Sequence, residues 1–147
     1  MQQMPYCRAR LLSLMLILLL SAFTAPARAA NEKCPISDAA TEKAGGFAPA
    51  VTAAIKTAWS CSGAYQILEA CQLGSSGDNV LSEEVLSKCE PMFLPKASAA
   101  IKESYKKARA KCDQIAVKKE GSMYQGQAAV CTARSARDFA RKHAPKG

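Results

Sequence analysis

Cysteine and histidine are two residue types that often carry nucleophilic or metal chemistry in proteins. The chain of 147 residues has seven cysteines but a single histidine, His143, close to its C-terminal end. A cysteine or serine nucleophile needs a neighbouring base, and only this histidine could supply an imidazole. A zinc site lacks ligands for a similar reason, because there is no second histidine and no close Cys-x2-Cys pair. We therefore expect a protein that is not an enzyme and that binds no metal or cofactor.

Acidic residues in the middle of the chain offer a second kind of chemistry. Glu83, Glu84 and Glu90 could be imagined as paired carboxylates for glycoside cleavage, whose acid must lie in a sheltered cleft. Acidic side chains near the start of a helix also complement the helix dipole, and this interpretation suits the short helix that we predict after a turn at residues 74–78. Together with Asp78, these residues are candidates for contacts with a basic partner protein rather than for catalysis.

The N-terminal segment has the three parts of a secretory signal peptide. Arg8 and Arg10 precede an apolar run of 13 residues over 11–23. That run is shorter than the roughly 18 to 20 residues needed to span a bilayer. Small residues at Ala27 and Ala29 then suit a signal peptidase. The alanine-rich signal is typical of bacteria, so we expect export to the periplasm or the medium.

Cleavage after residue 29 or 30 would leave a single domain over residues 30–147, with no stable membrane span. We expect residues 30–48 to be a loosely ordered lead-in. The remaining cysteines are Cys34, Cys61, Cys71, Cys89, Cys112 and Cys131. An even number of cysteines in a small exported chain predicts disulfides, here three.

The pairing is predicted from where the cysteines fall on the expected helices. Cys112 and Cys131 both face inward on neighbouring helices, at similar distances from the turn between them, so they form the first expected pair. Cys71 with Cys89, across the turn at residues 74–78, is the second. Cys34 with Cys61 follows by elimination, and the other pairings stay open.

The pattern of apolar residues predicts an all-α domain of four or five helices, because no strand-like alternation occurs. From Pro49 onward, one helical stripe contains Val51, Ile55, Ala58 and Trp59. The stripe changes sides at Gly63, so this helix is either central or breaks at residues 62–63. A corner at residues 91–95 is expected to bury Met92, Phe93 and Leu94.

The C-terminal half predicts an antiparallel helix hairpin. Its first helix begins near residue 98 and carries an apolar stripe that includes Tyr105 and Cys112. A turn at residues 118–122 leads into a last helix over residues 123–143. The inner face of that helix is expected to hold Tyr124, Ala128, Cys131, Ser135 and Phe139.

Charge is unevenly distributed between the two halves of the domain. Residues 30–95 contain 4 basic and 8 acidic residues, whereas residues 96–147 contain 13 basic and 4 acidic residues. Arg134, Arg137 and Arg141 fall within one arc of the last helix and are candidates for binding an anion. Alternatively, Arg134 and Arg141 pair with Asp138 along the helix. Lysines of the preceding helix are expected to be dispersed and solvated.

The segment around the last two cysteines resembles a known family. The resemblance is carried by Lys111-Cys112 at a helix end, the turn Glu120-Gly121-Ser122-Met123-Tyr124, and Ala128-Ala129-Val130-Cys131 on a basic helix. These stretches are similar to small secreted bacterial helical domains with paired cysteines, and among named groups to the N-terminal family of the lysozyme inhibitor LprI. The chain departs from that family at Ala100-Ile101, where a Leu-Asn pair would precede the tyrosine. The resemblance implies an exported helical module that binds an envelope enzyme such as lysozyme.

Two functional hypotheses follow from these observations. The first is a non-catalytic binding module, an inhibitor of a cell-envelope enzyme such as lysozyme, that engages its partner through the acidic candidates. The alternative is a protein that holds anionic envelope polymers through the arginines of its basic half. Nucleic acid is not an expected partner, because the chain is exported and no aromatic residues interleave with its basic ones.

Overall fold

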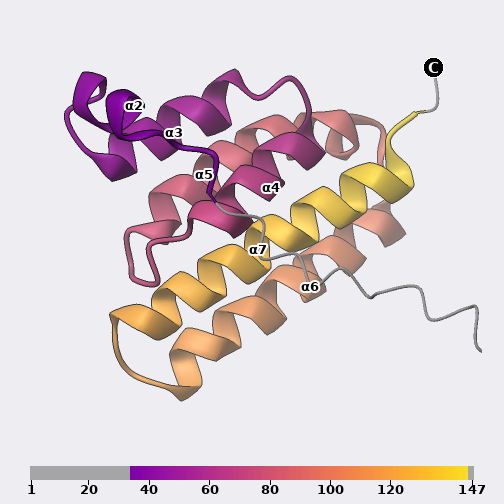
Figure 1. The fold of residues 1–147 in the computed structure, drawn as a ribbon. Helices are drawn as coiled ribbons and strands as arrows, with labels where there is room; N and C mark the ends of the chain where they lie inside the picture. The colour runs from indigo at the N-terminus through magenta and orange to yellow at the C-terminus, as the bar shows by residue number, and fades with distance from the viewer. Residues whose placement is uncertain (1–33, 146–147) are drawn as a thin grey trace, which may run out of the picture. The chain divides into compact units, whose positions relative to one another are not determined.

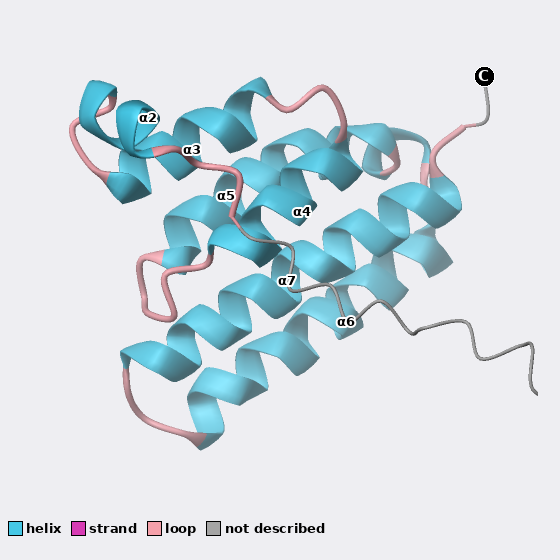
Figure 2. Ribbon diagram, viewed as in Figure 1, coloured by secondary structure: helices cyan, strands magenta, loops and turns pink. Residues whose placement is uncertain are grey.

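The computed structural model describes residues 34–145, and its regular structure in this range is entirely helical (Figure 2). The helices are α2 (Asp38–Lys43), α3 (Phe47–Thr57), α4 (Cys61–Cys71), α5 (Asp78–Cys89), α6 (Ala99–Lys118) and α7 (Ser122–His143), with 3-10 turns η1 (Glu90–Met92) and η2 (Leu94–Lys96). The predicted all-α, disulfide-bonded fold is confirmed. The predicted signal peptide, residues 1–29, lies outside the described residues.

Helix α7 is the element on which the others pack, because it contacts α4, α5 and α6. Figure 1 shows α6 and α7 side by side as the predicted antiparallel hairpin. A stripe of small residues on α7 is buried: Gly126, Ala129, Ala133, Ala136 and Ala140. The sequence prediction found only the side of α7 that carries Cys131 and Phe139. It missed this second stripe because alanine and glycine give little hydrophobic contrast against the rest of the helix.

The long helix expected after Pro49 is two helices, and the break lies earlier than residues 62–63. Helix α3 ends at Thr57, and Ala58 leaves the helical region with φ −55° and ψ 131°. Ser60 then caps α4, since its hydroxyl accepts a hydrogen bond of 3.0 Å from the Gly63 amide. Trp59 lies between the two caps.

This break overturns the expectation that Trp59 shares a stripe with Val51 and Ile55. Those two residues are fully buried, but the indole of Trp59 is 95% exposed. In a continuous helix, the four-residue spacing would have placed all three on one face. The change of direction at Ala58 instead turns Trp59 to the outside.

The corner after α5 supplies one large aromatic side chain to the core. Phe93 is buried and packs edge-on against Tyr105, with ring centroids 5.1 Å apart, while Phe139 of α7 completes the cluster. Met92, also expected in the core, is exposed. Leu94 is partly buried.

Three disulfides join the helices, and they correct two of the predicted pairs. Cys112–Cys131 links α6 to α7 as predicted. The predicted pairs Cys71–Cys89 and Cys34–Cys61 are wrong, because the bonds are Cys34–Cys71 and Cys61–Cys89.

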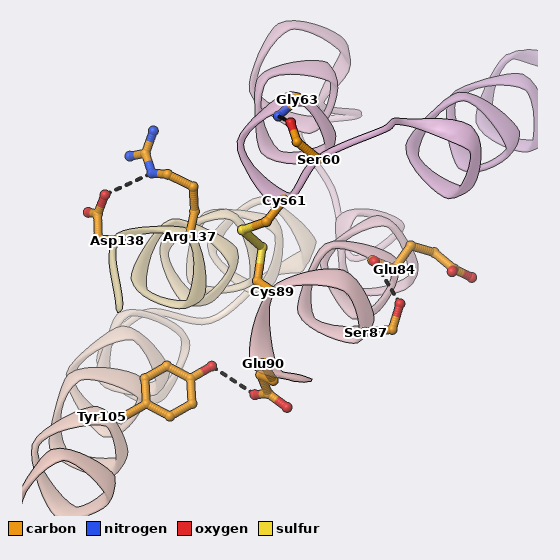
Figure 3. The surroundings of a disulfide bond; sticks show 10 residues. All are labelled: Ser60, Cys61, Gly63, Glu84, Ser87, Cys89, Glu90, Tyr105, Arg137 and Asp138. Atoms are coloured by element: carbon orange, nitrogen blue, oxygen red, sulfur yellow. Dashed lines mark hydrogen bonds and ion pairs between the residues drawn. A yellow bond between two sulfur atoms is a disulfide. The ribbon is translucent and has the colours of Figure 1, made fainter. Parts of the chain in front are cut away.

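The direction of the helices explains the correction. Helix α5 turns back along α4, so the end of α5 lies beside the start of α4, where Figure 3 shows the Cys61–Cys89 bond. Cys71 is at the other end of α4, and the 12 residues of α5 separate the two ends by roughly 16 Å, too far for a disulfide. Three disulfides in a domain of this size indicate an oxidising compartment outside the cytosol.

Candidate functional site

Asp78, a candidate for partner contacts, is fully buried. Its carboxylate accepts hydrogen bonds from the backbone amides of Leu73 at 2.7 Å, Gly74 at 2.9 Å and Ser75 at 3.2 Å. The turn that it organises lies against Gly126 of α7, where an added Cβ would be 2.5 Å from the Ser75 carbonyl oxygen. Asp78 therefore shapes the turn before α5 and docks it on α7, and it is inaccessible to a partner.

The other three acidic candidates, Glu83, Glu84 and Glu90, do not form one binding surface. Glu84 pairs with Lys56 of α3 at 3.1 Å. Glu90 accepts hydrogen bonds from the Tyr105 hydroxyl at 2.7 Å and from Arg109 Nη1 at 3.1 Å. Of the three, only Glu83 is exposed. Two of the three carboxylates thus neutralise cations of the protein itself.

Arg134, the first residue of the arginine arc, belongs to a network between α7 and α4. Its Nε donates to the Tyr65 hydroxyl at 2.8 Å, and its Nη2 donates to Glu69 Oε1 at 3.2 Å. The Tyr65 hydroxyl in turn donates to the same Glu69 oxygen at 2.8 Å. Burial raises the pKa of Tyr65 above its usual value, Arg134 partly offsets this, and Glu69 adds to it. The hydrogen bond to Tyr65 raises the pKa of Arg134.

The other two arginines of the arc share Asp138. Arg137 Nε is buried and lies 2.7 Å from Asp138 Oδ1, as an ion pair without hydrogen-bond geometry, and Figure 3 shows this pair. The Arg137 guanidinium also lies over the Tyr65 ring, 4.2 Å from its centroid. Arg141 Nη2 lies 4.0 Å from the same carboxylate oxygen. The arc is therefore largely occupied by the protein's own acids and aromatic ring.

A second tyrosine network secures the start of the hairpin. Tyr105 of α6 is buried, and its hydroxyl donates to Glu90, as Figure 3 shows. Burial raises the pKa of Tyr105 above its usual range, and the Glu90 carboxylate reinforces this shift. Arg109 approaches both the carboxylate and the tyrosine ring. Like the Tyr65 network, this one holds elements together.

The feature that best fits a binding site is the exposed tryptophan. Trp59 borders an apolar groove of about 370 Å³. We call this the Trp59 groove; it is lined by Pro35, Ala58, Trp59, Gly63, Gln66, Ile67 and Ala70. None of these side chains is charged.

The groove follows the outer face of α4. Gly63, Gln66, Ile67 and Ala70 recur at the spacing of a single helical stripe, on the side of α4 away from its fully buried residues. Ile67 and Ala70 are partly buried against the core, and Gln66 is exposed. Gly63 and Ala70 are small, so the floor between them is low, and their spacing of seven residues corresponds to roughly 10 Å. Such a shape accommodates an apolar side chain or the ridge of a helix.

The sequence prediction missed this site because residues 58–60, which link α3 to α4, include no glycine or proline that would indicate a break. The one usable signal is Ser60, a favoured N-cap residue three positions before Gly63. Recognising it would have ended the preceding helix before Trp59.

Residues 34–145 contain no group of three acidic, histidine or cysteine side chains arranged to hold a metal ion. Within the same range, no helix has the length and apolarity required to cross a membrane. Comparison with protein-family models, curated proteins and solved structures finds no match to this chain.

Proposed function

We propose that this protein is an exported, non-catalytic binding module that docks through the Trp59 groove onto an enzyme of the cell envelope, such as lysozyme. The observation that carries the proposal is the 95% exposure of Trp59 beside an uncharged groove. Burying a side chain of this size contributes roughly 4 kcal/mol of favourable free energy, and the isolated domain does not gain it because Trp59 is exposed. Tryptophan is also among the residues that dominate binding energy at protein interfaces.

The distribution of charge favours a basic protein as the occupant. The groove lies in the half of the chain that carries more acids than bases, 8 against 4 over residues 30–95. The basic half would repel a cationic enzyme, whereas the groove face would not. The resemblance to the LprI family points to the same class of partner. Three of the four acids predicted to make the contact are occupied within the fold, namely Asp78, Glu84 and Glu90, so the proposal transfers that role to Trp59.

The test is binding of the processed protein to lysozyme, measured by surface plasmon resonance and by inhibition of its activity. Trp59→Ala should weaken binding by about 30-fold, corresponding to roughly 2 kcal/mol at an interface anchor. Ala70→Lys, which places a charge on the groove floor, should weaken binding similarly. Trp59 is exposed, so its replacement should not unfold the protein, whereas Ala70 is partly buried against the core, and circular dichroism must show that the Ala70→Lys variant is folded before its binding is compared.

Val117→Ala and Glu83→Ala are the matched controls, since both residues are exposed and neither lines the groove. They should bind like the unchanged protein. Binding that survives Trp59→Ala would refute the groove as the docking site. Failure to bind lysozyme or the host's own cell-wall hydrolases would refute the proposed partner class.

A further inference from the structure

The charge that remains available in the basic half is on lysines. The arginines of α6 and α7 each lie against an acid: Arg109 against Glu90, Arg134 against Glu69, and Arg137 and Arg141 against Asp138. Among the α6 lysines, only Lys107 has an ion pair within the described residues, with Glu103 at 4.0 Å. Both members of that pair are well exposed, so it neutralises little.

Three lysines gather at the end of α6. Lys111, Lys118 and Lys119 line a surface hollow of about 280 Å³, together with Gln114 and Ile115. The Lys119 ammonium lies over the Tyr124 ring, 5.0 Å from its centroid, which restrains its position. The expectation of dispersed lysines is therefore wrong for this group.

The lysines continue along one side of the helix. Lys107, Lys111 and Lys118 are four and seven residues apart, which places them on one face at intervals of about 6 Å and about 10 Å. We call these three residues and Lys119 the α6 lysine stripe. Of the other helices in the described part of the chain, α6 packs mainly on α7, which leaves its outer side open (Figure 1).

We propose that the α6 lysine stripe binds a linear polymer that carries repeated phosphate groups. Lysine contributes a point charge suited to phosphate, whereas the planar arginine fork that matches carboxylates is already used on the protein's own acids. The ammonium groups are spread over about 16 Å, so a chain of anions can meet several of them at once. Ile115 is the one apolar residue that lines the hollow. The exposed Val117 lies about 100° around the helix from Lys118, so the stripe lacks the continuous apolar face that insertion into a lipid surface requires.

This surface is separate from the Trp59 groove, which lies on α4 and in the acidic half of the chain. The proposal therefore stands or falls independently of the proposed function. If both hold, the module can bind an enzyme with one face and an anionic polymer with the other.

The test compares two triple variants that lose the same number of charges. The stripe variant carries Lys111→Gln, Lys118→Gln and Lys119→Gln. The control carries Lys43→Gln, Lys96→Gln and Lys142→Gln, at exposed lysines outside the stripe. Binding of a fluorescently labelled short-chain polyphosphate is measured by anisotropy over a series of salt concentrations, and circular dichroism verifies that both variants are folded.

The stripe variant should lose about tenfold or more in affinity at low salt, and the control should lose much less. The slope of log K against log salt should become shallower by about 2 in the stripe variant, since each lost contact removes roughly 0.7. Equal losses in the two variants would show a response to net charge alone and would overturn the proposal. Tighter binding to polyglutamate, or binding only to anionic lipid vesicles, would overturn the choice of a phosphate polymer.

Discussion

Asp78 shows how a residue that resembles a binding group in the sequence can serve the fold instead. Its carboxylate satisfies three backbone amides of the turn before α5. Serine hydroxyls of residues 76 and 122 add a direct link from that turn to the start of α7. The sequence does not reveal that Asp78 is buried, because its burial depends on Gly126, 48 residues further along the chain. The absence of a side chain at Gly126 lets the turn that contains Ser75 and Asp78 lie close against α7.

Replacing Asp78 by Ala should lower the free energy of unfolding by about 3 kcal/mol, because three partly buried amides lose a charged acceptor. Glu83→Ala, on the exposed side of the same helix, should change it by less than about 0.5 kcal/mol. Urea titration of both variants measures the difference. Equal effects would mean that the Asp78 carboxylate does not organise the turn.

The two buried tyrosines make stability depend on alkaline pH. Burial raises the pKa of both Tyr65 and Tyr105 in the folded protein, above the value of about 10 that tyrosine has in an unfolded chain. Their contribution is therefore fully present below about pH 10 and is lost as the pH rises toward the folded values. Stability should fall by up to roughly 1.4 kcal/mol per pH unit for each tyrosine. Urea unfolding at several alkaline pH values tests this, and Tyr105→Phe should make the decline less steep.

At the level of elements, the sequence was most informative where helices are amphipathic and clearly capped. The hairpin of α6 and α7 and its Cys112–Cys131 bond followed from apolar spacing, Ser98 and Gly121. The break before α4 could not be found the same way, because the apolar stripe of α3 continues in register up to Trp59. The chain changes direction at residues 58–60, which include neither glycine nor proline. That change of direction exposes Trp59 and so creates the candidate site.

Helix α6 should be the first helix to open when its disulfide is removed, because it packs mainly on α7. The bond closes a segment of 19 residues, so replacing Cys112 and Cys131 by Ala should cost about 3 kcal/mol. Hydrogen exchange should accelerate in α6 and change little in α4 and α5. The matched variant without Cys34 and Cys71 should loosen the segment before α3 instead. Uniform acceleration in every helix would contradict this picture.

Across the whole described domain, the disulfides define two covalent groups. Cys34–Cys71 and Cys61–Cys89 interleave and tie the segment before α2 to α4 and α5. Cys112–Cys131 joins only α6 to α7. The two groups are held together by packing, by the tyrosine networks, and by a buried hydrogen bond from Ser82 to the Ala129 carbonyl. The acidic and basic halves of the sequence thus correspond to these two groups, and so do the two proposed binding faces.

This division predicts a definite result for cleavage between the groups. The form that we propose to start near residue 30 should contain no thiol that can be alkylated before reduction, because its six cysteines are all paired. Trypsin cleavage after the exposed Lys96 should then give two fragments that separate on a denaturing gel without reductant, since no disulfide crosses that position. Cleavage after Lys56 should leave its fragments joined through Cys34–Cys71. Fragments that stay linked after a cut at Lys96 would require a bond between the two groups and would overturn the pairing.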